Sequence, residues 1–337
     1  MKKYMIYIAV LSLTLLASCE KYLLGPDPEN TPVSNFEYLW QEADHKYSYF
    51  EYKSIDWDSV YSVFRPQVHN EMSDHALFDV LAEMLNVLED GHVNLQSDFD
   101  RSRNWDWMLD YPKNFNRTII SRNYLGEDYR ITGPLLNQVI DSVLYVYYGS
   151  FASTISQANL NELMQRAQGL RGVIIDIRSN GGGSSYNAFR LAACFTDSSY
   201  NFARDRVKMG PGSNDFSPWT TMTVTPRSGQ RFSGPLILLC NRGVYSAANY
   251  FTQMMKANPR ATLIGDHTGG GGGVPAYGEL PNGWIYRFSS TQAVNMEGEH
   301  IENGIEVDVR KDLHPLDEAL GIDTILEYAL DYLRADS

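Results

Sequence analysis

The chain has 337 residues, of which 43% are hydrophobic and 20% are charged. This composition supports a buried core in one large domain or two modest ones, and it excludes a mainly disordered chain. The 28 lysines and arginines are outnumbered by 41 aspartates and glutamates, which gives a net charge of −13. Because nucleic-acid binding needs a basic face, we expect no nucleic-acid partner.

The N-terminus is typical of a bacterial lipoprotein signal. Two lysines precede an apolar run over residues 4–16, which is too short to span a membrane as a mature helix. A Leu-Ala-Ser-Cys sequence follows and ends at Cys19, in the pattern of a lipobox. The alternative is an ordinary secretory signal in which Cys19 is incidental. We expect a signal peptide over 1–18, acylation of Cys19 (palmitate) and an exported protein anchored by lipid, facing the periplasm or the cell surface.

Two cysteines remain once Cys19 is set aside. Cys194 lies in a helix-like segment and Cys240 ends an apolar, strand-like segment. An exported protein can form a disulfide, but these positions favour two buried free thiols. No Cys/His cluster has the spacing of metal ligands, and we expect neither a metal nor a cofactor.

The first third of the chain is predicted to be helical after a tether. Residues 19–34 are rich in proline, glycine and polar side chains, as in a linker. Aromatic residues at helical spacing over 36–52 and 57–64 predict helices. Ser73 precedes an amphipathic helix in which apolar residues recur every three or four positions, up to Asp90-Gly91-His92. We therefore expect a small helical N-terminal domain over 35–92.

Residues 93–141 are irregular, with short strand-like pieces such as 118–121, and we interpret them as a linker or short insert. Beyond them, strands and helices alternate. Strands are expected at 143–148, 172–177, 235–240, 261–264 and, flanking a Pro-Asn-Gly turn, at 277–280 and 284–289. Helices are expected at 155–168, 184–195, 246–257 and 316–333. This alternation predicts an α/β domain over 142–337, with helices packed on a sheet.

Two segments place chemistry at the end of a buried strand. Residues 176–183 run from a strand into three glycines and then a helix, and consecutive glycines let backbone N–H groups approach a bound oxygen. The sequence fits neither a Walker loop nor GxGxxG, so an oxyanion site and a plain tight turn are the two interpretations. Ser246 begins the helix after the next strand, where it is either an N-cap or a nucleophile.

Two further side chains are candidates only in combination with these segments. His92 follows the amphipathic helix directly, and Glu302 lies in a polar loop. Taken alone, a histidine beside a turn and a carboxylate in a loop are more typical of ordinary surface positions.

Together, these segments resemble the C-terminal processing peptidases, or tail-specific proteases, and especially the branch similar to the catalytic core of tricorn protease. The resemblance covers roughly residues 36–309 and rests on the order of its motifs. They are Ile55-Asp56-Trp57-Asp58, Leu88-Glu89-Asp90-Gly91-His92, Asp176-Ile177-Arg178-Ser179-Asn180-Gly181-Gly182, Ser246-Ala247-Ala248, Leu263-Ile264-Gly265-Asp266-His267-Thr268-Gly269-Gly270 and Glu302-Asn303-Gly304-Ile305. The resemblance implies a serine peptidase with peptide or protein substrates, on a crotonase/ClpP-like layered α/β core.

The resemblance also implies roles for individual residues. Ser246 matches the nucleophile. The oxyanion hole is matched by Gly181, Gly182 and the backbone N–H of Ala247. A lysine base occurs in one branch at the position of Gly271, and this chain has no lysine between 256 and 311.

The tricorn-like branch instead uses a histidine base oriented by a glutamate, and His92 and Glu302 match those positions. An ordinary imidazole has a pKa of about 6.5, so we expect activity to fall on acidification through about pH 6–7.

The chain departs from the family pattern in three places. Gly91 replaces the serine that precedes the tricorn histidine, and Val307-Asp308 replaces a Pro-Asp pair. Residues 93–141 are too few for a complete PDZ domain, so we expect this family member to lack one.

Three alternatives compete with a His92-based peptidase. The first is a catalytically silent peptide-binding lipoprotein on the same fold. The second uses His267 as the base, since it lies near the glycine run. The third is a crotonase-like acyl-thioester enzyme that works without Ser246, which export from the cytoplasm disfavours.

The lipid anchor has a direct test. Replacing Cys19 with alanine removes the thiol that would be acylated, so we expect Cys19→Ala to leave the membrane fraction or to keep its signal peptide. Membrane fractionation with mass spectrometry of the N-terminus measures both. Normal cleavage with unchanged membrane retention would contradict acylation at Cys19.

Overall fold

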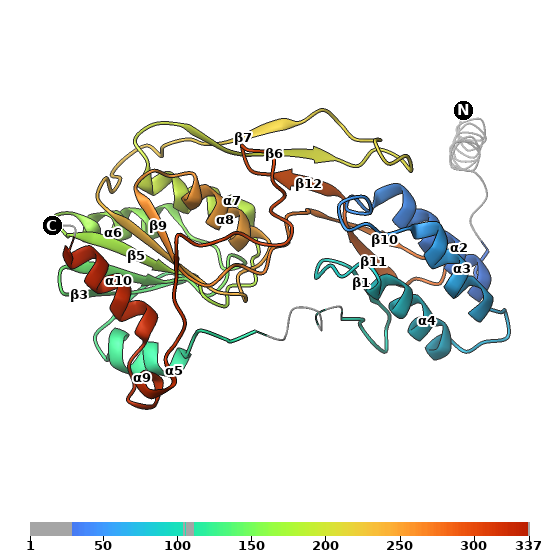
Figure 1. Ribbon diagram of the computed structural model, residues 1–337, viewed down its shortest axis with the longest axis horizontal. Coiled ribbons are helices and arrows are strands. Elements are labelled where there is room, and N and C mark those ends of the chain that lie inside the picture. The colour runs from blue at the N-terminus through green and yellow to red at the C-terminus, as the bar shows by residue number, and fades with distance from the viewer. Residues whose placement is uncertain (1–28, 104, 106–110, 336–337) are drawn as a thin grey trace, which may run out of the picture.

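A seven-stranded mixed sheet lies at the centre of the C-terminal part of the computed structural model, which describes residues 29–103, 105 and 111–335 (Figure 1). Its strand order is β13-β9-β8-β5-β4-β3-β2. The five strands from β13 to β4 run parallel, and β3 and β2 are antiparallel additions at one edge. The strands are β2 (Arg130–Thr132), β3 (Leu135–Ile140), β4 (Val143–Tyr147), β5 (Gly172–Asp176), β8 (Leu236–Cys240), β9 (Ala261–Gly265) and β13 (Val309–Arg310).

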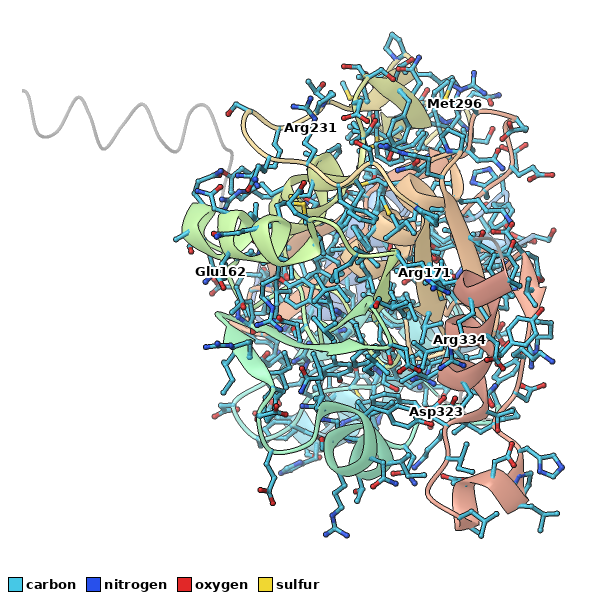
Figure 2. All side chains as sticks on the ribbon, turned by 90° about the vertical axis from the view of Figure 1, so that its left-hand side faces the viewer. Glu162, Arg171, Arg231, Met296, Asp323 and Arg334 are labelled. Atoms are coloured by element: carbon cyan, nitrogen blue, oxygen red, sulfur yellow. The ribbon has the colours of Figure 1, made fainter. Side chains whose placement is uncertain are left out.

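Helices cover both faces of this sheet, because its central strands are apolar on both sides. In β5, Val173 and Ile175 pack against one helical layer and Ile174 against the other. The first layer contains α6 (Gln157–Ala167), α7 (Ser185–Ala192) and α8 (Ala247–Lys256). The second contains the π-helix Ile120–Leu125, which follows α5 (Arg117–Ile119), and α10 (Thr324–Ala335). Figure 2 shows α6, with Glu162, and α10, with Arg334, on opposite sides of the sheet. The predicted layered α/β core is confirmed.

The N-terminal part is helical, as predicted. Its helices are α2 (Pro32–Lys46), α3 (Trp57–Phe64), a 3-10 turn (Arg65–Gln67) and α4 (Asp74–Asn86). Thr31, Asp56 and Ser73 cap α2, α3 and α4 through side-chain oxygens that accept backbone N–H groups. These caps explain why the sequence places the starts of α3 and α4 correctly.

The helical part is completed by a hairpin from late in the chain. Strands β10 (Pro275–Glu279) and β11 (Ile285–Ser289) pair with β1 (Asn94–Gln96) in a three-stranded sheet. Trp284, Tyr286 and Phe288 are buried in the same apolar cluster as the N-terminal helices. In space, therefore, the helical domain includes residues that the sequence analysis placed in the 142–337 core.

A third sheet, which the sequence analysis did not predict, extends from the α/β core towards the helical part (Figure 1). It consists of β6 (Tyr200–Val207), β7 (Thr220–Val224) and β12 (Thr291–Val294), all antiparallel, in the order β12-β6-β7. Because β12 follows β11 almost directly, this sheet and the hairpin form one continuous connection between the two parts.

Two predicted elements are wrong. Residues 118–121 are helical, not extended, because the Asn116 side chain accepts the N–H groups of Thr118 and Ile119 and starts α5, which continues as a π-helix (Ile120–Leu125). The single terminal helix is split into α9 (Pro315–Ala319) and α10. Gly321, with φ +78°, ends the first, and the Asp323 carboxylate accepts the first N–H groups of the second.

Residues 93–141 do not form a separate linker, since β2 and β3 within them extend the main sheet. Cys194 and Cys240 are buried free thiols, as expected. The predicted signal peptide and Cys19 lie outside the described residues. Within the described ranges, no helix has the length and apolar character needed to cross a membrane.

Candidate active site

Ser246 occupies a strained backbone position at the junction of β8 and α8. Its φ is 57° and its ψ is −124°, in a region that residues other than glycine rarely adopt, at a cost of about 1–3 kcal/mol. Its N–H donates to the carbonyl oxygen of Gly270 at 2.8 Å, which holds the turn in place. Although Ser246 is the N-cap residue of α8, its side chain makes no capping hydrogen bond. The hydroxyl is therefore left for another partner.

That partner is His92. Its Nε2 lies 2.9 Å from the Ser246 Oγ. His92 comes from the helical part, in the loop between α4 and β1, whereas Ser246 comes from the α/β core. The serine–histidine pair therefore forms across the two parts of the molecule, as the sequence analysis predicted for these two residues.

The loop that carries His92 is fixed by three polar contacts. The Asp90 Oδ1 accepts the N–H of His92 at 2.8 Å and the hydroxyl of Tyr245 at 3.3 Å. The Nε of Arg287 donates to the His92 carbonyl at 2.6 Å. Burial lowers the pKa of His92 to about 4, although the Asp90 charge opposes this shift. The imidazole is thus neutral at pH 7, with a pKa below the ordinary value that the sequence analysis assumed.

Glu302 is buried beside the site, but it makes no hydrogen bond to His92, contrary to the expectation from the sequence. Its Oε2 accepts the N–H groups of Gly272 and Gly273 at 2.8 and 3.3 Å, and its Oε1 lies 3.3 Å from the Nζ of Lys53. Among the described residues, the Nδ1 of His92 has no hydrogen-bond partner. Burial and the Asp90 charge raise the pKa of Glu302 to about 8, against the opposing effect of Lys53. A direct His–Glu hydrogen bond is therefore not part of this geometry.

Lys53 is a site residue that the sequence analysis missed. Besides Glu302, its ammonium contacts the carbonyl oxygens of Leu88 and Glu89, at 3.2 and 2.7 Å, in the loop that leads to His92. The ammonium is almost buried, so it links the helical part to the Glu302 loop in a weakly solvated environment. In the sequence, the only indication of this role is that Lys53 is a charged residue inside the aromatic segment before Asp56 and Trp57.

The buried ring of Tyr245 explains two departures from the family pattern. A Cβ at Gly271 would lie 2.6 Å from the ring carbon Cζ, so no lysine fits where the other branch has its base. A Cβ at Gly91 would lie 2.9 Å from the Tyr245 hydroxyl, so a serine before His92 is also disfavoured. Tyr245 thus occupies the space that a side chain at either position would need.

The glycine loop lies against the nucleophile. Gly182 has φ +97°, and a Cβ there would lie 2.8 Å from the Ser246 Cβ and 3.0 Å from the Ala247 nitrogen. However, the Gly182 N–H donates to the Asn180 side chain at 3.0 Å, so it is not free to bind an oxyanion as the sequence analysis assumed. Gly181 borders open space. The Ala247 N–H is the first of α8, at the positive end of the helix.

A buried ionic network anchors this loop. The Arg178 guanidinium lies between Asp176, at 2.6 Å, and Asp323, at 3.0 Å, and all three side chains are inaccessible to solvent. Asp323, labelled in Figure 2, precedes α10, so the network ties the end of β5 to that helix. The strand end from which the glycines emerge is therefore rigidly placed.

His267 does not take part in the serine–histidine pair. Its Nε2 lies 2.9 Å from the Asn303 carbonyl, and its Nδ1 lies 2.9 Å from the Glu306 carboxylate. The geometry does not support His267 as the base.

Family comparisons agree with this geometry. The model of peptidase family S41 matches residues 142–311, half of the chain. The chain belongs to peptidase family S41. A second model, the tricorn protease C1 domain, matches residues 28–86 of the helical part.

The relatives of this S41 chain include solved structures and curated proteins. A crystal structure from Parabacteroides merdae ATCC 43184, described as a candidate peptidase, is 40% identical with a TM-score of 0.86, covering 90% of this chain and 97% of that one. Tricorn protease shares the fold at 14% identity, with a TM-score of 0.57 over 91% of this chain and 37% of that one. The carboxy-terminal processing protease CtpA of Bacillus subtilis is 25% identical over 147 residues, 43% of this chain. That match spans 30% of the length of CtpA.

The close approach of Gly182 to the nucleophile predicts a matched pair of variants. Gly182→Ala should displace Ser246 and the Ala247 amide, lowering kcat by about 100-fold or more, the effect of losing an oxyanion donor. Gly181→Ala should fold and react normally with a small fluorophosphonate, because a Cβ there meets nothing within 4 Å. Steady-state kinetics and probe labelling measure both. Equal activity of the two variants would contradict the assigned packing.

Proposed function

We propose that this S41 protein is a serine endopeptidase that hydrolyses peptide bonds of exported polypeptides, anchored to the membrane by lipid on Cys19. The observation that carries the proposal is the 2.9 Å contact between the His92 Nε2 and the Ser246 hydroxyl. Ser246 has a strained backbone at the start of α8, and its side chain makes no capping hydrogen bond. The similarity to CtpA, named as a carboxy-terminal processing protease, supports the reaction class. The lipid anchor rests on the N-terminal sequence.

In the first half of the reaction, His92 Nε2 takes the Ser246 proton as Oγ attacks the substrate carbonyl carbon. The tetrahedral intermediate collapses with cleavage of the C–N bond, and the imidazolium returns the proton to the leaving amine. The acyl group stays on Ser246 as an ester. In the second half, His92 deprotonates water, which attacks the ester and releases a carboxylic acid and the free serine.

The oxyanion that forms in both halves is bound by backbone amides. The Ala247 N–H is one donor, since it adjoins the nucleophile and begins α8. The second donor is the Gly181 amide in the glycine loop, because the neighbouring Gly182 N–H already donates to the Asn180 side chain. Gly182 itself supplies the close backbone approach that places the loop against Ser246.

The two buried carboxylates have different tasks in this proposal. Asp90 supplies the negative charge that stabilises the His92 imidazolium, since it is the carboxylate whose charge acts most strongly on that ring. Glu302 orients the base indirectly, because it holds Lys53, which in turn binds the Leu88 and Glu89 carbonyls before the histidine loop.

Chemical labelling and mutagenesis test the proposed nucleophile and base. A fluorophosphonate should attach to Ser246 in the unmodified protein, and a peptide map of a cleaved unfolded protein should show new termini. His92→Ala and Ser246→Ala should each lower kcat by about 10³-fold or more, and the double variant should be little worse, because such groups act as a unit. His267→Ala is the control and should retain activity. Absence of both labelling and cleavage would favour the silent peptide-binding alternative.

The buried position of His92 predicts an unusual pH profile. Because the pKa of His92 is lowered to about 4, the base stays unprotonated well below neutrality, and kcat/KM should fall only as the pH approaches 4. Asp90→Asn removes a charge that favours the imidazolium, so it should move this acid limb to still lower pH and reduce kcat. Glu302→Gln should leave the limb in place. An acid limb at about pH 6–7, the range of an exposed imidazole, would contradict the burial argument.

A further inference from the structure

A small cavity opens directly beside the nucleophile. It has a volume of about 140 Å³ and is lined by Ser246 and Ala247 together with segments of the glycine loop, the β6-β7 ribbon and the chain after the glycine run. Its walls are mainly apolar and include Met222, Tyr250 and Val274. Because the cavity adjoins the Ser246 hydroxyl, it is placed to receive the side chain of a substrate residue next to the scissile bond.

One carboxylate faces this apolar cavity. Asp205, on β6, is the single charged side chain among the described residues that line it. Partial burial raises the pKa of Asp205, and among the described residues no cation pairs with its carboxylate. A carboxylate that has lost part of its hydration without gaining an ion pair is suited to receive a cation from outside.

The basic neighbours of Asp205 are occupied elsewhere. Successive residues of a strand point to opposite faces, so Arg204 and Arg206 are directed away from the cavity. The Arg206 guanidinium lies over the Phe216 ring at 3.9 Å and donates to Gln292. The Arg204 guanidinium lies over the Trp219 ring at 5.9 Å. The Tyr250 hydroxyl is also engaged, because it donates to the Gly272 carbonyl at 2.8 Å.

We propose that this cavity binds the side chain of the substrate residue that supplies the scissile carbonyl, and that Asp205 selects lysine or arginine at that position. The inference rests on the proposed peptidase activity and adds the substrate class. A lysine or arginine side chain has an aliphatic stem and a cationic end, which match the apolar walls and the single carboxylate. An acidic side chain would meet like charge, and an apolar one would leave the carboxylate without a partner.

The test compares peptides that differ only at the residue before the scissile bond: lysine, norleucine or glutamate. The unmodified protein should cleave the lysine peptide with a kcat/KM about tenfold or more above the norleucine peptide, a modest selectivity for one partly desolvated ion pair. Asp205→Asn should remove most of this preference, because it lowers kcat/KM for the lysine peptide and no longer disfavours the norleucine peptide. Glu297→Gln, which removes an exposed charge outside the cavity, is the control and should keep the lysine preference.

A binding measurement separates failure of this inference from failure of the peptidase proposal. Ser246→Ala should bind the lysine peptide more tightly than the norleucine peptide by calorimetry, and Ser246→Ala/Asp205→Asn should not. That binding preference would support the cavity assignment even if no peptide is cleaved. Absence of cleavage would overturn the proposed catalysis but not the cavity assignment. Equal binding and equal cleavage of the two peptides, or an Asp205→Asn effect that is the same for both, would overturn the assignment of Asp205.

Discussion

The packing of the Tyr245 ring is the constraint on which the geometry of the site depends. The ring lies 4.9 Å from the His92 imidazole, and its hydroxyl reaches Asp90. It is the residue before the strained serine, so the turn that presents Ser246 also drives this ring into the centre of the site. The ring leaves no room for side chains at Gly91 or Gly271. One aromatic side chain therefore decides which base this site can use.

The contact between Lys53 and Glu302 joins the helical part to the loop that carries Glu302. The base comes from the helical part and the nucleophile from the core, so their alignment depends on contacts that cross between the two. The Lys53–Glu302 pair is such a contact, and it is nearly excluded from solvent. Because the pKa of Glu302 is raised to about 8, this contact at pH 7 is mainly a buried hydrogen bond from the Lys53 ammonium to a protonated carboxyl. Through this link a cation supports the architecture of the site without contacting the serine.

The sequence predicted those features that depend on local signals. Ser73 caps α4 where expected, and the alternation of apolar strands with helices identified the central sheet and its layers. The glycine loop and Ser246 each follow the end of a strand, β5 and β8. Because these two strands are parallel neighbours, their ends meet at one edge of the sheet. The sequence did not predict β6, because the Arg204-Asp205-Arg206 run resembles a loop, and Asp205 was missed with it. Lys53 and the low pKa of His92 depend on long-range burial, which no local pattern carries.

The hairpin of β10 and β11 makes the order of synthesis relevant to when the site can form. The apolar cluster of the helical part lacks Trp284, Tyr286 and Phe288 until this late segment has arrived, although the helices themselves come first in the chain. A chain that emerges from its N-terminus thus holds His92 on an incomplete scaffold until residues 275–289 have followed. A chain synthesised only as far as β9 therefore already contains both His92 and Ser246, but it lacks the hairpin that completes the scaffold of the histidine.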